Sequence, residues 1–250
     1  MASQSHVRNF LAQRIAVHHQ PKSNSNPPLK PSCPASAKCT RGFKIMSILL
    51  LSVTDNLDPD LRESLRLEIA MRGNTVAYIS SEPQEGDRPY YLSTIEDYSK
   101  ISEGVKVDYF DLSENFSDEN LLKLLNYGTI YLSGGNTYVF MDSANKRNIS
   151  QILNKHLESG GLLIGASAGS IMMTPTIDLA GFEDENIPNL KDTSGFGFVD
   201  FEFHPHYSND RDYLSEYING ENNDLYVCKD GSGIFYSNGE IKLFGEVSKF

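Results

Sequence analysis

The chain has 250 residues and a formal net charge of −11, and this charge is unevenly distributed along the sequence. Residues 1–45 contain seven Lys and Arg residues and no acid, which leaves residues 46–250 with 15 basic against 33 acidic residues and a net charge of −18. A protein with that balance repels nucleic acid and anionic lipid, so we expect neither as a partner. No segment has the apolar length that a membrane-spanning helix needs. Three cysteines are too few for a disulfide scaffold, which indicates a reducing compartment and a cytoplasmic location.

Residues 1–45 are predicted to be disordered. They contain five of the eleven prolines and many Ser and Asn residues, and they lack the apolar surface that would offset the entropy of ordering. Their Arg and Ser content and the absence of acids are compatible with an organelle transit peptide. An upstream extension is the favoured interpretation, because Met46 begins a sequence that runs directly into an apolar segment. Residues 46–250 are expected to form a single domain.

From Met46 onward, segments with the pattern of buried strands alternate with segments that carry a helical apolar stripe. This alternation predicts an α/β protein with a mostly parallel sheet covered by helices and an antiparallel finish. The predicted strands are 48–53, 75–79, 105–111, 129–132, 162–164, 198–203 and 225–227, followed by a hairpin of 234–236 and 241–244. The predicted helices are 58–72, a segment ending near 101, 117–125 with Ser117 as its cap, 138–158 with a break near 146–148, and 210–218.

The most informative motif is Gly165-Ala166-Ser167-Ala168-Gly169, which follows a predicted strand and precedes a helix-forming stretch. This G-x-S-x-G pattern is typical of a nucleophile elbow, in which a tight turn exposes the serine hydroxyl. Glycines lack a Cβ and let neighbouring backbone approach a crowded turn. Amides at the start of the following helix would point to where an oxyanion forms. Ser167 is therefore a candidate nucleophile, and the chain is expected to be an enzyme.

A serine nucleophile needs a base to take its proton, and three of the six histidines lie in residues 1–45. His156 lies near the end of a predicted helix, where a surface role is the favoured interpretation. His204 and His206 follow a predicted strand, and active sites gather after the carboxyl ends of parallel strands. We select His206 as the base, with His204 as the alternative base or a structural histidine.

Two further parts of a hydrolytic site are less well defined by the residues. Gly134-Gly135-Asn136 follows one predicted strand and precedes a helix, so its amides could help to form an oxyanion hole. A third group should orient the imidazole. The sequence does not select one of the acids between Ser167 and His206 for this role. These acids are Asp178, Glu183, Asp184, Glu185, Asp192, Asp200 and Glu202.

Three motifs in this order resemble the serine dipeptidase E/cyanophycinase family, peptidase family S51. They are Leu132–Thr137, Gly165–Ser170 and Pro205-His206-Tyr207, and the segment from Lys229 to Ile241 also looks like that family's C-terminal strands. The resemblance runs from about residue 46 to 250. It implies a three-layer α/β/α fold of the class I glutamine-amidotransferase type. It also implies hydrolysis of peptides through a serine acyl-enzyme, often with aspartate before the scissile bond.

Carried over residue by residue, the resemblance makes Ser167 the nucleophile, His206 the base, and Gly135 and Ala168 the oxyanion amides. Two positions depart from the family pattern. The family often has a third glycine where this chain has Ser133, and its aspartate usually follows a Thr/Asn-rich segment after Pro-Thr-Ile. A two-residue shift from that pattern would give the acid's role to Asp184.

The function expected from these observations is a serine hydrolase of small acidic peptides that needs no cofactor or metal ion. The substrate carboxylate would need a cation, for which Arg211 is the first candidate and Arg147 the second. Two alternatives are an esterase built on the same elbow and a non-catalytic family member that binds a peptide or metabolite. Against the esterase, α/β-hydrolases usually place their histidine further downstream than the 39 residues that separate Ser167 from His206. A homodimer is an assembly that the sequence permits.

Overall fold

The computed structural model describes residues 46–82, 88–112, 117–208, 213–218 and 224–250, which belong to one compact unit, Ile45–Phe250. The strands are β1 (Ser47–Leu51), β2 (Thr75–Ser80), β3 (Lys106–Asp111), β4 (Thr129–Leu132), β5 (Leu162–Ala166), β6 (Glu202–His204), β7 (Leu225–Cys228), β8 (Gly233–Ser237), β9 (Glu240–Phe244) and β10 (Val247–Lys249). The α-helices are α2 (Pro59–Met71), α3 (Pro89–Ile101), α4 (Asp118–Leu122), α5 (Thr137–Lys146), α6 (Ile149–Glu158), α7 (Ala168–Ile171) and α8 (Tyr213–Ile218). Two 3₁₀ helices are η1 (Lys123–Asn126) and η2 (Asp178–Phe182).

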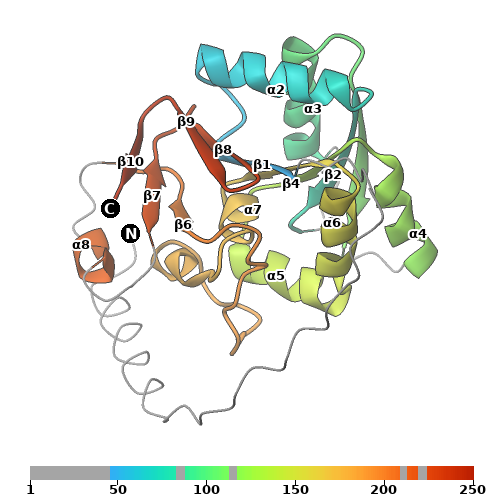
Figure 1. Ribbon diagram of the computed structural model, residues 1–250. Coiled ribbons are helices and arrows are strands. Elements are labelled where there is room, and N and C mark those ends of the chain that lie inside the picture. Colours follow the sequence, from blue (N-terminus) through green and yellow to red (C-terminus); the bar gives the residue numbers. More distant parts are fainter. Residues whose placement is uncertain (1–45, 83–87, 113–116, 209–212, 219–223) are drawn as a thin grey trace, which may run out of the picture. The chain divides into compact units, whose positions relative to one another are not determined.

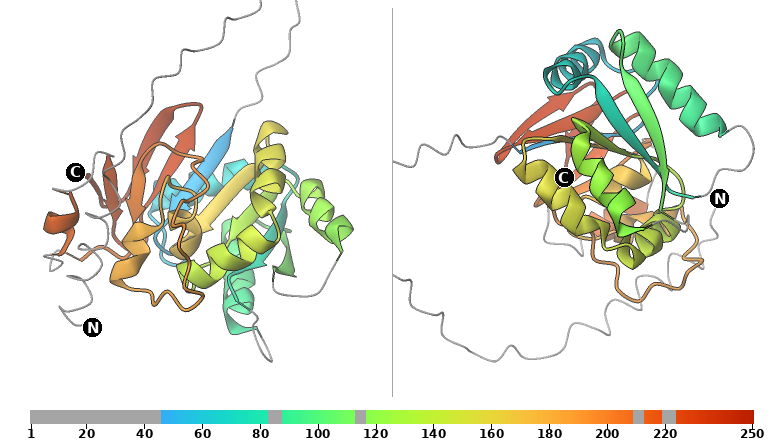
Figure 2. Two further views of the ribbon diagram at one scale, coloured as in Figure 1. Left: turned by 90° about the horizontal axis from the view of Figure 1, so that it is seen from below. Right: turned by 90° about the vertical axis from the view of Figure 1, so that its right-hand side faces the viewer.

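Seven strands form a central sheet in the order β3-β2-β4-β5-β1-β8-β9. The strands from β3 to β1 are parallel, and the β8–β9 hairpin adds to β1 in the antiparallel sense. Every residue of β1 and β5 is buried, because helices cover both faces of the sheet. Helices α2 and α3 lie on one face, and α5 and α6 lie on the other (Figures 1 and 2). This arrangement confirms the predicted three-layer α/β/α fold.

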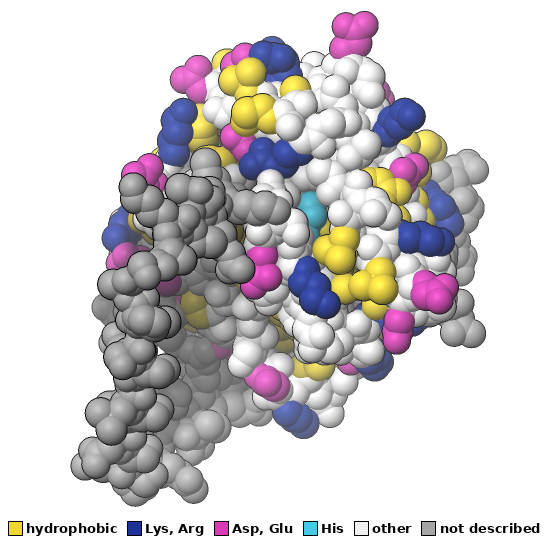
Figure 3. All heavy atoms as spheres, turned by 45° about the vertical axis from the view of Figure 1, so that its right-hand side comes forward, with side chains coloured by type: hydrophobic (Ala, Val, Ile, Leu, Met, Phe, Trp, Pro, Cys, Tyr) yellow, Lys and Arg dark blue, Asp and Glu magenta, His cyan; other side chains and the backbone are white. Residues whose placement is uncertain are grey.

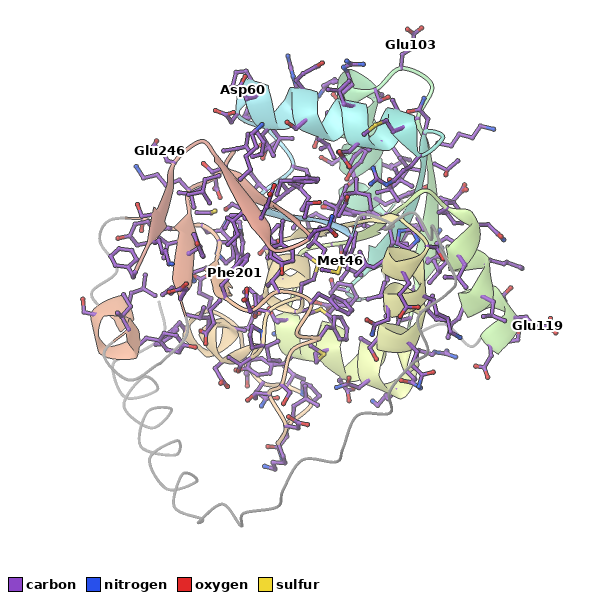
Figure 4. The ribbon with its side chains drawn as sticks, viewed as in Figure 1. Met46, Asp60, Glu103, Glu119, Phe201 and Glu246 are labelled. Carbon is purple, nitrogen blue, oxygen red and sulfur yellow. The ribbon has the colours of Figure 1, made fainter. Side chains whose placement is uncertain are left out.

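The first helix shows how local sequence positions an element on the sheet. Asp58 is the N-cap of α2, and its side chain accepts hydrogen bonds from the amides of Asp60 and Leu61. The helix buries Leu61, Leu65 and Ile69 on its sheet-facing side. Asp60 points away from the sheet on the opposite side (Figure 4). Propensity, capping and apolar spacing therefore agree in this segment, and its predicted bounds are confirmed to within a residue.

The long helical segment on the other face contains the predicted break. Helix α5 ends at Lys146, Asn148 adopts a left-handed conformation with φ of 51°, and α6 begins at Ile149. The expected surface position of His156 is wrong, because its side chain is only 2% exposed and its Nε2 lies 3.0 Å from the Leu162 carbonyl oxygen. Gly161 packs directly against this imidazole. Burial of the ring lowers the pKa of His156.

The C-terminal part contains a second sheet that was not predicted from the sequence. Strands β10, β7 and β6 form a three-stranded sheet that is separate from the large sheet, and β6 is parallel to β7. Strand β6 covers Glu202–His204, so it is shorter than the predicted strand 198–203 and begins four residues later. Phe201 precedes it and fills the interior, where it packs edge-on against Tyr226 (Figure 4). Ser117 occupies the N-cap position of α4, as predicted, but its side chain makes no capping hydrogen bond.

Two further observations concern the apolar character of the helices and the distribution of surface charge. Among the described residues, every helix falls short of the length and apolar character needed to cross a membrane. On the face shown in Figure 3, Lys and Arg side chains are interspersed with Asp and Glu side chains.

Candidate active site

The carboxyl ends of four neighbouring parallel strands open onto one cleft of about 1310 Å³. Residues that follow β1, β2, β4 and β5 line its floor, and one side of α3 forms a wall. Ser167 and His206 both line this cleft. The Asp, Glu, Lys and Arg residues that line it are Asp55, Arg62, Glu82, Glu96, Asp97 and Lys100. The structure thus brings the nucleophile and base selected from sequence to the expected edge of the sheet.

Ser167 occupies the sharp turn between β5 and α7. Its backbone angles are φ 51° and ψ −114°, a sparsely populated combination for a residue with a side chain. The turn is close-packed: a Cβ on Gly165 would lie 2.5 Å from the backbone of Gly169, and one on Gly169 would lie 2.2 Å from the Leu132 carbonyl oxygen. The two glycines of the motif therefore let α7 approach β4 and β5, and the strained turn presents the serine hydroxyl to the cleft.

His206 lies in the connection after β6 and has a positive φ of 54°. Its Nε2 is 2.9 Å from Ser167 Oγ, and its Nδ1 is 2.7 Å from Asp230 Oδ1. An Nδ1 that faces a carboxylate carries the ring proton, which leaves Nε2 free to accept the serine proton. His204 is not at the nucleophile; its side chain is 2% exposed within β6.

The carboxylate that contacts the imidazole is Asp230, not Asp184. Asp184 Oδ2 instead accepts a hydrogen bond of 2.8 Å from the Thr137 amide at the start of α5. The assignment of Asp184 as the acid beside the base is therefore corrected by the geometry. Asp184 braces the loop before α5, whereas Asp230 completes a continuous line of hydrogen bonds from carboxylate to imidazole to hydroxyl.

The Gly134-Gly135-Asn136 loop lies next to the nucleophile. A Cβ on Gly134 would be 3.4 Å from the Cβ of Ser167. Gly135 has φ of 131°, and a Cβ there would fall 2.1 Å from Ser81 Oγ, so only glycine fits this position. Asn136 caps α5 by accepting from the Val139 amide. This geometry sets the loop and the start of α7, with Ala168, beside the same hydroxyl.

Of the two cations proposed from sequence, the one that the structure describes, Arg147, is not among the residues that line this cleft. Arg147 donates from Nε to the Leu112 carbonyl oxygen and lines a separate hollow with Lys146. Arg211 lies outside the described residues. Within the described ranges, no three His, Cys, Asp or Glu side chains are grouped as metal ligands.

Asp230 is not among the acids predicted from sequence, which all lie between Ser167 and His206. A usable signal was present. Asp230 follows a predicted strand and precedes Gly231, which is the same strand-end position that singled out His206. The third side chain could therefore have been sought at every predicted strand end.

Comparisons with known proteins identify the family and the fold. The model of peptidase family S51 matches residues 48–244. An uncharacterized peptidase of Pasteurella multocida is 28% identical over 56% of this chain and 68% of its own length. A peptidase E of Nostoc is 24% identical over 79% of this chain and 85% of its own. A crystal structure of a candidate peptidase E protein from Listeria monocytogenes superposes with a TM-score of 0.67 at 22% identity, covering 80% of this chain and 98% of that one.

Proposed function

Because the chain belongs to peptidase family S51, we propose that it is a serine peptidase that hydrolyses small peptides through an acyl-enzyme on Ser167. One observation carries the proposal. Ser167 Oγ, the His206 imidazole and the Asp230 carboxylate are joined by contacts of 2.9 Å and 2.7 Å at the bottom of an open cleft. A serine hydroxyl linked to a base, with the base linked to an acid, is the arrangement that activates the oxygen for attack on a carbonyl.

In the proposed reaction, His206 Nε2 takes the proton of Ser167 as Oγ attacks the scissile carbonyl. The amides of Gly135 and Ala168 are the candidate donors to the resulting oxyanion. Asp230 holds the ring by its Nδ1 and stabilises the imidazolium. The imidazolium then gives its proton to the departing amine, and water attacks the acyl-enzyme with the same ring as base.

The finer part of the proposal is an aspartyl residue before the scissile bond, and it rests on the family resemblance. The cleft has Arg62 and Lys100 among its lining cations, and Lys100 is bound to Glu96 at 2.9 Å. Arg62 and Arg211 are therefore the two arginines to test as partners of the substrate carboxylate. The carboxylates along the cleft suit the positive α-ammonium group of a peptide cleaved next to its free N-terminus.

The first test is a fluorophosphonate probe applied to wild type and Ser167→Ala. We expect labelling of wild type alone; an unlabelled wild type would contradict the serine mechanism and favour a binding protein. Turnover is then measured on Asp-X, Asn-X, Glu-X and Ala-X dipeptides, N-acetyl-Asp-X and p-nitrophenyl esters. Asp-X should be hydrolysed fastest and its acetylated form poorly. Faster turnover of esters than of every peptide would support the esterase alternative.

Charge-removing variants then locate the specificity group. Arg62→Gln and Arg211→Gln are compared on Asp-X and Asn-X, which differ by one charge. The variant that removes the partner should lose its preference for Asp-X and keep its rate on Asn-X. If both variants keep the full preference, neither arginine reads the substrate carboxylate.

A further inference from the structure

A buried serine that the proposed mechanism does not use connects two members of the triad. Ser52 directly follows β1, and its side chain is fully buried. Its Oγ donates to Asp230 Oδ1 at 2.7 Å and accepts from the backbone amide of His206 at 2.8 Å. A hydroxyl has one proton and two lone pairs, so both bonds can be made at once. The Ser52 hydroxyl thus contacts the carboxylate of the acid and the backbone amide of the base, and it also lies 3.5 Å from His206 Nδ1.

The two residues that Ser52 contacts, His206 and Asp230, lie in segments that connect strands. The Asp230 side chain is 62% exposed and the His206 side chain is 32% exposed. An exposed carboxylate samples several rotamers and competes with water for its hydrogen bonds. Ser52 and His206 Nδ1 bind the same carboxylate oxygen, Oδ1. The buried hydroxyl therefore holds that oxygen in the position where the imidazole needs it.

The residue before Ser52 holds the nucleophile. The Leu51 carbonyl accepts from the Ser167 amide at 3.0 Å and from Ser170 Oγ at 2.9 Å. Two consecutive residues at the end of β1 therefore touch all three triad segments, which lie 115 or more positions further along the chain. Strand β1 can serve this purpose because it lies between β5 and β8 in the sheet.

We propose that Ser52 is a positioning residue of the triad, whose hydroxyl fixes the Asp230 carboxylate and the His206 backbone relative to Ser167. The inference rests on the proposed serine mechanism. Its energetic basis is orientation, because small displacements of a catalytic group cost one to two orders of magnitude in rate. Without the hydroxyl, Asp230 turns toward solvent and the ring loses the partner that fixes its tautomer.

The test compares Ser52→Ala with Ser47→Ala. Ser47 is a matched control, since it lies at the opposite end of β1, is 1% exposed, and accepts from Arg72 rather than from any triad residue. We expect the second-order rate constant for fluorophosphonate labelling to fall about 10- to 100-fold in Ser52→Ala and less than about 2-fold in Ser47→Ala. Ser52→Thr, which keeps the hydroxyl, should recover most of the rate. Equal losses in the two alanine variants would overturn the proposal.

A double-mutant cycle separates positioning from a general effect on folding. In an Asp230→Asn background, the further change Ser52→Ala should slow labelling less than about 3-fold, because the group that Ser52 positions is already impaired. Multiplicative losses in the double variant would show that Ser52 acts independently of Asp230 and would overturn the proposal.

Ring ¹⁵N NMR of His206 gives a readout that does not depend on turnover. Wild type and Ser47→Ala should show a predominant tautomer with the proton on Nδ1, and Ser52→Ala should show a larger share of the other tautomer. Unchanged tautomer populations in a folded Ser52→Ala protein would contradict the positioning role. Failure of the proposed function is distinguishable, because it would appear as an unlabelled wild type with this tautomer shift still present.

Discussion

The nucleophile and its two triad partners are held in place by different kinds of contact. Ser167 directly follows a strand whose five residues are all buried, and its turn is fixed by close contacts of Gly165 and Gly169 with neighbouring backbone. His206 and Asp230 follow strands of the small sheet and have partly exposed side chains held by hydrogen bonds. Packing therefore positions the nucleophile and polar contacts position its partners. Substitutions that disturb the packing around Ser167 should lower the free energy of unfolding. Substitutions of the polar groups that hold His206 and Asp230 should lower the reaction rate.

The largest effect should come from the base. His206→Ala should lower the fluorophosphonate labelling rate by about 10⁴-fold or more, because no other group takes the Ser167 proton. His204→Ala serves as the control, since His204 is buried in β6 away from the hydroxyl. It should lower the melting temperature and leave the labelling rate within about 10-fold of wild type. The reverse result would move the base to His204.

The next effect distinguishes the two aspartates. Asp230→Asn should slow labelling about 10³- to 10⁴-fold, since an amide at this position favours the wrong imidazole tautomer. Asp184→Asn should slow it less than about 10-fold, because it weakens only the hydrogen bond to the Thr137 amide. The measurement is the second-order rate constant for fluorophosphonate labelling, taken at a pH above which it no longer increases. A greater loss in Asp184→Asn would restore that residue as the catalytic acid.

On the packed side, Gly169→Ala should lower the free energy of unfolding by about 3 kcal/mol, because the new Cβ meets the Leu132 carbonyl. Gly104→Ala isolates the backbone cost, since φ is 74° there and nothing lies within 4 Å of the added carbon. It should cost about 1 kcal/mol. Urea denaturation gives both values, and a smaller loss for Gly169→Ala than for Gly104→Ala would show that the elbow is not close-packed.

The smallest effect is a pH dependence of stability away from the site. Burial lowers the pKa of His156 in the folded protein, so the unfolded chain binds its proton at higher pH. The stabilising contribution is complete above about pH 6.5 and is lost as pH falls through the lowered folded value. His156→Gln should remove up to about 1.4 kcal/mol per pH unit from the slope of unfolding free energy below pH 6.5. An unchanged slope, measured by urea titration, would contradict this assignment.

Local pattern was sufficient for the elements that build the nucleophile's side of the site. The apolar run before Ser167, the two glycines around it and the break near Asn148 are each decided by neighbours in sequence. The fold class followed from the alternation of such segments. The predicted family is likewise confirmed by the match over residues 48–244.

The other side of the site depends on pairing between distant segments. The second sheet requires β6 and β7 to pair with each other and not with the large sheet, and no local pattern specifies this choice. Asp230 reaches His206 across 24 residues through that pairing, so the order of acids along the chain was misleading. The burial of His156 depends on Gly161, whose missing side chain makes room for the ring. These features are tertiary, which is why periodicity did not reveal them.

The place of β1 in the sheet has a consequence during biosynthesis. Its antiparallel neighbour, Gly233–Ser237, comes after the elbow in the sequence, and Asp230 comes just before that neighbour. A chain synthesised only as far as the elbow therefore lacks both the flanking strand and the acid. Hydrolytic competence would arise only after Asp230 and β8 have been synthesised.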